Sequence, residues 1–306
     1  MGTPDFAVGA LEAIVAAGHT VTEVVTQPDK AKGRSGQAQF PPVKECAVKH
    51  GIPVFQPVKI KAPDAVEELK KFEADIFVVA AFGQILSKEI LDMPKFGCVN
   101  IHASLLPKYR GAAPINWCII NGEKETGVTI QQMNEGIDTG DILAAKSMAI
   151  APDETAESLF DKLSRLGAKL IVETLPKLER GEITPVPQDE ALASHTKMMS
   201  KSLGRIDWNN DAVSIERLVR GLNSWPSAYT FWNKKSLKLW RCEVIDAESE
   251  NADLAGKVTS VSKDSFDVAC AKGALRVWEL QLEGKKRMDT KTFLLGNQVN
   301  VGDLLG

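Results

Sequence analysis

Short apolar segments alternate with segments of helical periodicity through the first hundred residues, and this alternation constrains the fold more than any other feature of the sequence. The apolar segments are rich in β-branched residues, as is typical of strands buried on both faces of a parallel sheet. The predicted strands are 21–26, 75–80 and 98–101, and the predicted helices are 6–17, 41–50 and 63–72. Such an alternation predicts an α/β domain with a doubly wound, Rossmann-like sheet.

The next hundred residues complete this predicted domain and lead out of it. Residues 126–133 and 141–150 are predicted strands on either side of a glycine-rich loop. A core-facing helix that ends near Gly181 is predicted by leucines at helical spacing, namely Leu159, Leu163, Leu166 and Leu170. We therefore place a catalytic domain at 1–183 and a linker at 184–203, where two prolines precede polar residues of little periodicity.

Residues 204–306 have the pattern of a small domain rich in strands. A helix is predicted at 214–222, and the short alternating runs are 236–241, 257–261, 266–270 and 274–280. Short strands separated by Gly, Asp and Asn turns predict a small β-barrel of the type that binds oligonucleotides.

Composition and charge narrow the class of protein. The 306 residues are 44% hydrophobic and 25% charged, which is typical of a globular protein with a substantial core. The net charge is −3, but residues 201–306 hold 16 Lys and Arg against 14 Asp and Glu, whereas residues 1–200 hold 21 against 26. A mildly basic C-terminal part favours a polyanionic partner.

The cysteine pattern and the hydropathy indicate the compartment. Cysteines stand at positions 46, 98, 118, 242 and 270, and no two have the CxxC spacing. This odd, scattered set argues against a disulfide framework or a zinc site and favours a reducing compartment. The sequence has neither a membrane-length apolar run nor a secretory signal pattern, so we expect a cytoplasmic protein without a membrane partner.

Polar side chains stand where a strand of the predicted sheet ends. Asn100 and His102 are two residues apart at the end of strand 98–101, so they point to the same side, and Asp138 lies in the loop Gly136–Asp141. Ligands of open α/β sheets bind at the carboxyl ends of strands. An amide and an imidazole can donate to an oxyanion, and a carboxylate can orient the imidazole or move protons. A single histidine at a strand end is more often structural, and only the combination fits transfer of an acyl group without a metal or a covalent nucleophile. Such a transfer needs no serine or cysteine if the acceptor is itself an amine.

The segment Asn100–Pro114 resembles the signature of the folate-dependent formyltransferases, and in particular of those that act on methionyl-tRNA. The resemblance extends over nearly the whole chain, through the segments 2–7, 26–30, 125–130, 205–208, 225–226 and 284–286. It implies that a formyl group passes from 10-formyltetrahydrofolate to the α-amino group of methionine on initiator tRNA, for translation initiation in a bacterial-type cytoplasm.

Carried onto this sequence, the resemblance implies two groups of site residues and no metal. The catalytic residues would be Asn100, His102 and Asp138. The folate would be bound by the loop formed by Ser104, Leu105, Leu106 and Pro107, although a Leu-Leu pair also suits core packing. We expect the enzyme to act as a monomer.

The tRNA contacts implied by the resemblance are basic residues in two places. The loop 27–42 carries Lys30, Lys32 and Arg34, and loops of this length are usually functional or disordered. Lys285 and Lys286, followed by Arg287, form a basic cluster in a predicted turn. Such residues contact phosphates, which supply affinity but little sequence choice.

The start of the sequence departs from the family pattern. Members of the family begin with a short apolar strand before the residues that match Gly2–Ala7, whereas here Met1 directly precedes Gly2. We expect that the natural protein is several residues longer, and that a chain beginning at Met1 is unstable or poorly active because neighbouring backbone groups lose their partners.

Two alternatives stay open at this point. A related formyltransferase could act on another amine, of a nucleotide sugar or of a purine ribonucleotide. The scaffold could also be a catalytically inactive tRNA-binding protein.

Overall fold

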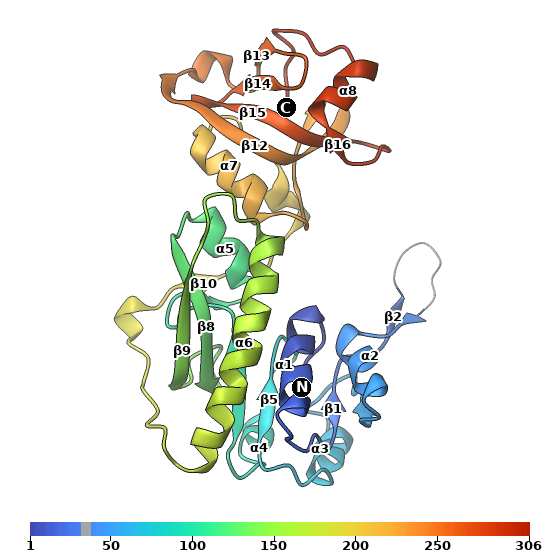
Figure 1. Cartoon of the computed structure of the whole chain (residues 1–306), viewed down its shortest axis with the longest axis vertical. Helices are drawn as coiled ribbons and strands as arrows, with labels where there is room; N and C mark the ends of the chain where they lie inside the picture. The colour runs from blue at the N-terminus through green and yellow to red at the C-terminus, as the bar shows by residue number, and fades with distance from the viewer. Residues whose placement is uncertain (32–37) are drawn as a thin grey trace. The chain divides into compact units, whose positions relative to one another are not determined.

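The computed structural model describes residues 1–31 and 38–306, which divide into two compact units (Figure 1). The first unit comprises residues 1–114, 125–149 and 160–196, and the second comprises 115–124, 150–159 and 197–306. In the part of the chain that the structure describes, no helix is both long enough and apolar enough to cross a bilayer.

The first unit begins with parallel strands connected by helices. Strand β1 (Val24–Val25) pairs with β4 (Val54–Phe55), and β5 (Phe77–Val79) pairs with β6 (Cys98–His102). The intervening helices are α1 (Asp5–Ala16), α2 (Pro42–Lys49), α3 (Pro63–Lys70) and α4 (Lys88–Leu91). These helices lie within two residues of the predicted ranges where a prediction was made, whereas β1 is much shorter than the predicted strand 21–26.

Beyond β6 the sheet becomes antiparallel. Strand β8 (Glu125–Gln132) pairs with β6, and β9 (Ile142–Ala149) pairs with β8. The chain between β6 and β8 contains β7 (Arg110–Gly111) and α5 (Pro114–Ile120). The sheet is therefore mixed, and the parallel arrangement typical of a doubly wound fold ends at β6.

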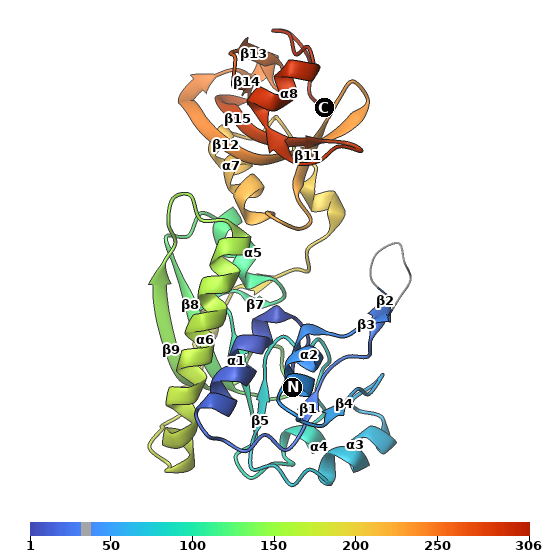
Figure 2. The ribbon, with the colours of Figure 1, turned by 45° about the vertical axis from the view of Figure 1, so that its right-hand side comes forward.

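Helix α6 (Ala156–Glu179) lies along β8 and β9 (Figure 2). The leucines at 159, 163 and 170 are buried, as their spacing predicts, and Leu166 is partly buried. Gly167 allows the helix to approach the sheet closely, because a Cβ at this position would lie 2.8 Å from Ile101 Cγ2. The chain leaves the helix at Gly181, whose φ of +68° suits glycine.

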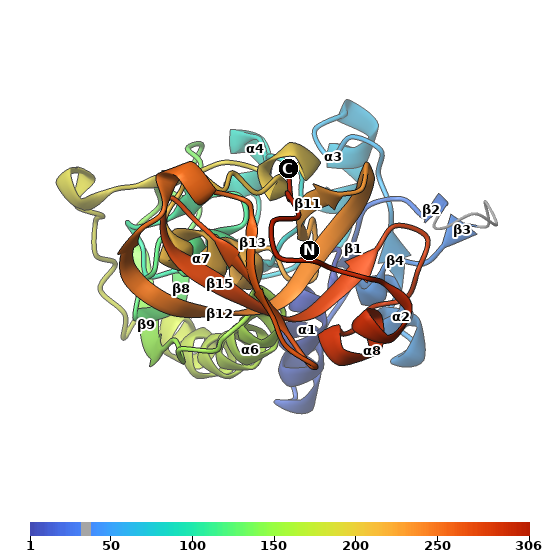
Figure 3. The same cartoon turned by 90° about the horizontal axis from the view of Figure 1, so that it is seen from above.

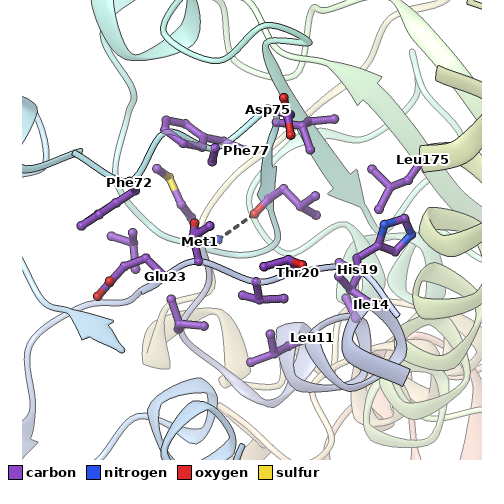
Figure 4. Close-up of a pocket in the computed structure, with 18 of the residues that line it drawn as sticks. Met1, Leu11, Ile14, His19, Thr20, Glu23, Phe72, Asp75, Phe77 and Leu175 are labelled. Atoms are coloured by element: carbon purple, nitrogen blue, oxygen red, sulfur yellow. Dashed lines mark hydrogen bonds between the residues drawn. The ribbon is translucent and has the colours of Figure 1, made fainter. Parts of the chain in front are cut away.

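A cavity of about 780 Å³ lies between β1 and β5, and Met1 is one of the residues that line it (Figure 4). Leu11, Phe72 and Phe77 are among the side chains that line it. The Met1 ammonium donates to Val78 O at 2.7 Å, and its burial lowers its pKa to about 6. In the described residues β1 and β5 are therefore connected through Met1 and Gly2 rather than through a strand.

The second unit contains an antiparallel sheet of six strands. The strands follow the order β11 (Ala228–Trp232), β12 (Lys235–Glu250), β15 (Lys272–Leu282), β14 (Phe266–Ala269) and β13 (Val258–Val261), with β16 (Met288–Asp289) on β15. Strand β12 bends along its length (Figure 3), and its pairing with β15 shifts register at three points. Helices α7 (Ala212–Gly221) and α8 (Thr290–Gly296) contribute to the same apolar core.

Candidate active site

Strand β6 places Asn100 and His102 on one side of the sheet, beside β8. Asn100 is paired with Gln131 and His102 with Thr129 in the antiparallel ladder. His102 is buried, whereas Asn100 is partly exposed. Backbone pairing on this side therefore fixes the positions of both predicted side chains.

The loop between β8 and β9 brings Asp138 to these two residues. Its Oδ1 accepts from Asn100 Nδ2 at 3.3 Å and lies 3.6 Å from His102 Nδ1. Gln131 Nε2 also donates to Oδ1 at 2.8 Å, and the backbone N–H of Gly111 donates to Oδ2 at 2.8 Å. The amide, the imidazole and the carboxylate that the sequence predicts as catalytic thus meet at one point.

The two ring nitrogens of His102 face different groups. Nε2 lies 2.9 Å from the carbonyl oxygen of Tyr109. Because a carbonyl can only accept, Nε2 carries a proton in this arrangement. Nδ1 is the nitrogen that faces Asp138, 3.6 Å from its Oδ1.

The predicted folate loop is tied to β8 through Thr129. Thr129 Oγ1 donates to Ser104 O at 2.7 Å and accepts from Leu106 N at 3.1 Å. Ser104 Oγ donates across the turn to Lys108 O at 2.7 Å, and Pro107 is partly exposed. Leu105 packs so closely on the backbone of β8 that a Cβ at Gly127 would lie 2.5 Å from it. The loop therefore has a defined shape beside His102.

One polar atom at the site is left open. Gln131 is 2% exposed, and its Oε1 has no hydrogen-bond partner among the described residues, while its Nε2 is held by Asp138. A buried acceptor without a donor costs free energy. The position therefore fits a ligand that brings an N–H group to the Gln131 amide oxygen.

A buried arginine adjoins the site. The Arg110 side chain is 1% exposed, and Nη1 and Nη2 donate to the two carboxylate oxygens of Glu190 at 2.9 and 2.7 Å. These hydrogen bonds raise the pKa of the guanidinium and lower the pKa of the Glu190 carboxyl. Arg110 thus remains charged next to the loop that leads to Gly111.

The predicted tRNA contacts are exposed where the structure describes them. Lys30 lies on β2 (Lys30–Ala31), which pairs with β3 (Ala38–Gln39), and its Nζ donates to Gln27 Oε1 at 3.0 Å. Lys32 and Arg34 lie outside the described residues. Lys285 and Lys286 are exposed in the turn between β15 and β16, whereas Arg287 pairs with Glu279 at 2.6 Å.

Both parts of the chain match families of formyl transferases. Residues 1–175 match the family described as formyl transferase, and residues 198–298 match the formyl transferase C-terminal domain. Methionyl-tRNA formyltransferase of Agathobacter rectalis is 58% identical over 302 residues, which cover 99% of this chain and 97% of that protein. The enzyme of the same name from Lachnospira eligens is 53% identical and covers 100% and 98%.

The chain belongs to the methionyl-tRNA formyltransferase family. Solved formyltransferase structures show the same fold at lower identity. WlaRD, a sugar 3N-formyl transferase, matches with a TM-score of 0.66 and 19% identity, covering 93% of this chain and 97% of its own. An N-formyltransferase from Helicobacter canadensis matches with a TM-score of 0.67 and 19% identity, covering 94% and 97%.

Sequence reasoning did not assign several residues that this family member brings to the site. Gln131 can be identified only from the β6–β8 register, which the sequence does not give. Arg110 lies in the segment that resembles the family signature, but no acidic residue stands near it in the sequence to indicate an ion pair. Gln188 and Glu190 lie in the range predicted as a linker, 78 and 80 residues from the arginine that they contact.

Proposed function

We propose that the protein transfers the formyl group of 10-formyltetrahydrofolate to the α-amino group of methionine on initiator tRNA. The observation that carries this proposal is the convergence of Asn100, His102 and Asp138, in a chain 58% identical over its length to a methionyl-tRNA formyltransferase. An amine acceptor can attack the formyl carbon directly, so the transfer needs no covalent enzyme intermediate.

Each of the three residues has a role that follows from its contacts. As the amine attacks the formyl carbon, Asn100 Nδ2 and a protonated His102 Nδ1 donate to the negative charge on the formyl oxygen. Asp138 is held by Gly111 N and Gln131 and keeps His102 oriented. Since 3.6 Å is longer than a direct hydrogen bond, proton exchange between the two side chains uses water or a small closure.

The proton that the amine loses must reach the nitrogen that leaves the formyl carbon. Asp138 and His102 carry this proton, so that one C–N bond forms as the other breaks and no net charge stays on the enzyme. Folate supplies the formyl group in this scheme, and the loop formed by Ser104, Leu105, Leu106 and Pro107 is its proposed contact. The open acceptor of Gln131 supports a ligand with N–H groups at this point.

The tRNA contacts are proposed at Lys30, Lys32 and Arg34 in one unit and at Lys285 and Lys286 in the other. Lys30, Lys285 and Lys286 are exposed, as phosphate contacts must be.

We assign the catalytic domain to 1–183, the linker to 184–203 and a tRNA-binding domain to 204–306. The bent, register-shifted β12 supports an oligonucleotide-binding barrel in that last domain. The proposed state is a cytoplasmic monomer.

A formylation assay with 10-formyl folate tests the proposal. Charged initiator methionyl-tRNA is offered as acceptor in parallel with uncharged tRNA, a nucleotide amino sugar and a purine ribonucleotide amine. Formylation of the charged tRNA alone is the expected result. Formylation of the sugar or the ribonucleotide but not the tRNA would assign a different acceptor, and binding of tRNA without turnover would identify an inactive scaffold.

A further inference from the structure

Residues 186–196, here called the strap, connect the two loops that form the site. At one end Val186 exchanges two backbone hydrogen bonds with Ile142, at 2.8 and 2.9 Å, where β9 begins. At the other end β10 (His195–Thr196) pairs in parallel with β7, and Ser194 O accepts from Arg110 N at 2.8 Å. The strap is therefore anchored next to the Asp138 loop and next to the loop that follows His102.

Between these anchors Arg110 holds two strap side chains. Its Nε donates to Gln188 Oε1 at 2.9 Å, while its other two nitrogens bind Glu190. The guanidinium is buried, whereas the Glu190 side chain is 72% exposed. Arg110 therefore binds the strap from the buried side. Because Arg110 occupies the Oε1 acceptor of Gln188, the Nε2 donor of the same amide points toward other groups.

The Gln188 amide is aimed at the backbone of the Asp138 loop. Nε2 donates to Asp138 O at 2.9 Å and to Gly140 O at 2.7 Å. Asp138 has a φ of +53°, in the left-handed region that residues other than glycine adopt uncommonly. Gly140 is packed so tightly that a Cβ would lie 1.6 Å from Gln132 O. Gln188 thus binds this loop at both residues, on either side of Thr139.

We propose that Gln188 is a positioning residue for formyl transfer, a role that rests on the proposed function. Arg110 orients its amide, the amide fixes the backbone at Asp138 and Gly140, and the fixed backbone directs the carboxylate at Asn100 and His102. In the described residues the Gln188 side chain hydrogen-bonds Arg110 and the two loop carbonyls and none of the three catalytic side chains, so it acts through the conformation of Asp138. Misplacement of a catalytic group by about 1 Å can cost about 10²-fold in rate.

The test is Gln188→Met, which keeps the length of the side chain and removes both the donor and the acceptor. We expect kcat for formylation of charged initiator tRNA to fall by about 10- to 100-fold, with KM for both substrates largely unchanged. Gln188→Glu keeps the acceptor for Arg110 but loses the donor to the two carbonyls, and it should lose as much. Gln298→Met is the matched control, since Gln298 is exposed and contacts only the nearby Asn300 in the described residues.

A double-mutant cycle separates positioning from general support of the fold. In an Asp138→Ala background the carboxylate that Gln188 directs is gone, so adding Gln188→Met should cause little further loss of kcat. A loss as large as in the wild-type background would overturn the inference. So would a change confined to KM, or wild-type kcat in both Gln188 variants. If the wild-type protein itself fails to formylate the charged tRNA, the proposed function falls instead.

Discussion

Two regions of the first unit differ in their strand pairing. The sheet is continuous at β6, whereas it is interrupted between β1 and β5 in the described residues. β6 is paired on both sides, with β5 through three residue pairs and with β8 through four. Between β1 and β5 the described pairings run through Met1 and Gly2, where Gly2 N donates to Val25 O and Ala80 N to Met1 O. A cavity continues beyond them (Figure 4).

This difference suggests that catalytic geometry and stability depend on different parts of the unit. Asn100, His102 and Asp138 are held by β6, β8 and the strap, and none of the three lines the cavity. We therefore expect changes at the site to alter turnover and changes at the cavity to alter unfolding.

The largest effect is expected at the site. His102→Ala and Asp138→Ala should each lower kcat by about 10²-fold or more and leave tRNA binding largely intact. Single-turnover formylation and tRNA binding by filter retention measure the two quantities. Asp138→Asn serves as a comparison. Its amide keeps an oxygen that can accept from Gly111 N, but it lacks the negative charge that stabilises a protonated His102. Near-native turnover in either alanine variant would remove that residue from the catalytic set.

Filling the cavity should give the largest gain in stability. An extension at Met1 of about five Val and Ile residues, the length of an ordinary strand, would pair with β1 and β5. Each buried apolar side chain contributes about 1.5–3 kcal/mol before the cost of ordering it. Thermal unfolding of this variant is compared with that of an equally long Gly-Ser extension. Equal melting temperatures would show that the gap does not limit stability.

The smallest effect is expected at the basic turn. Lys285→Ala and Lys286→Ala should each weaken tRNA binding without changing kcat at saturating tRNA, and each should reduce the salt slope of binding by about 1. Lys263→Ala, in the exposed turn between β13 and β14, is the matched control. If the salt slope of tRNA binding in these variants equals that of Lys263→Ala, the tRNA phosphates do not contact this turn.

The sequence predicts the elements around the site because their signals are local. The apolar run that became β6 and the glycine-bounded loop at Asp138 are both visible without a structure. The antiparallel return of β8 is not, because strand direction depends on how residues 103–124 fold. Gln188 and its partner carbonyls lie 48 and 50 residues apart, in a stretch without periodicity, so no spacing rule links them. β1 is shorter than the predicted strand 21–26, because its pairing with β4 involves Val24 and Val25 alone among the described residues.

The decisive measurement is formylation of charged initiator tRNA by the wild-type protein and by Asp138→Ala, side by side at equal folded fractions. We expect formyl-methionyl-tRNA with the wild-type protein and a rate lower by about 10²-fold or more with the variant. Equal rates in the two proteins, or no formylated tRNA with either, would contradict this expectation.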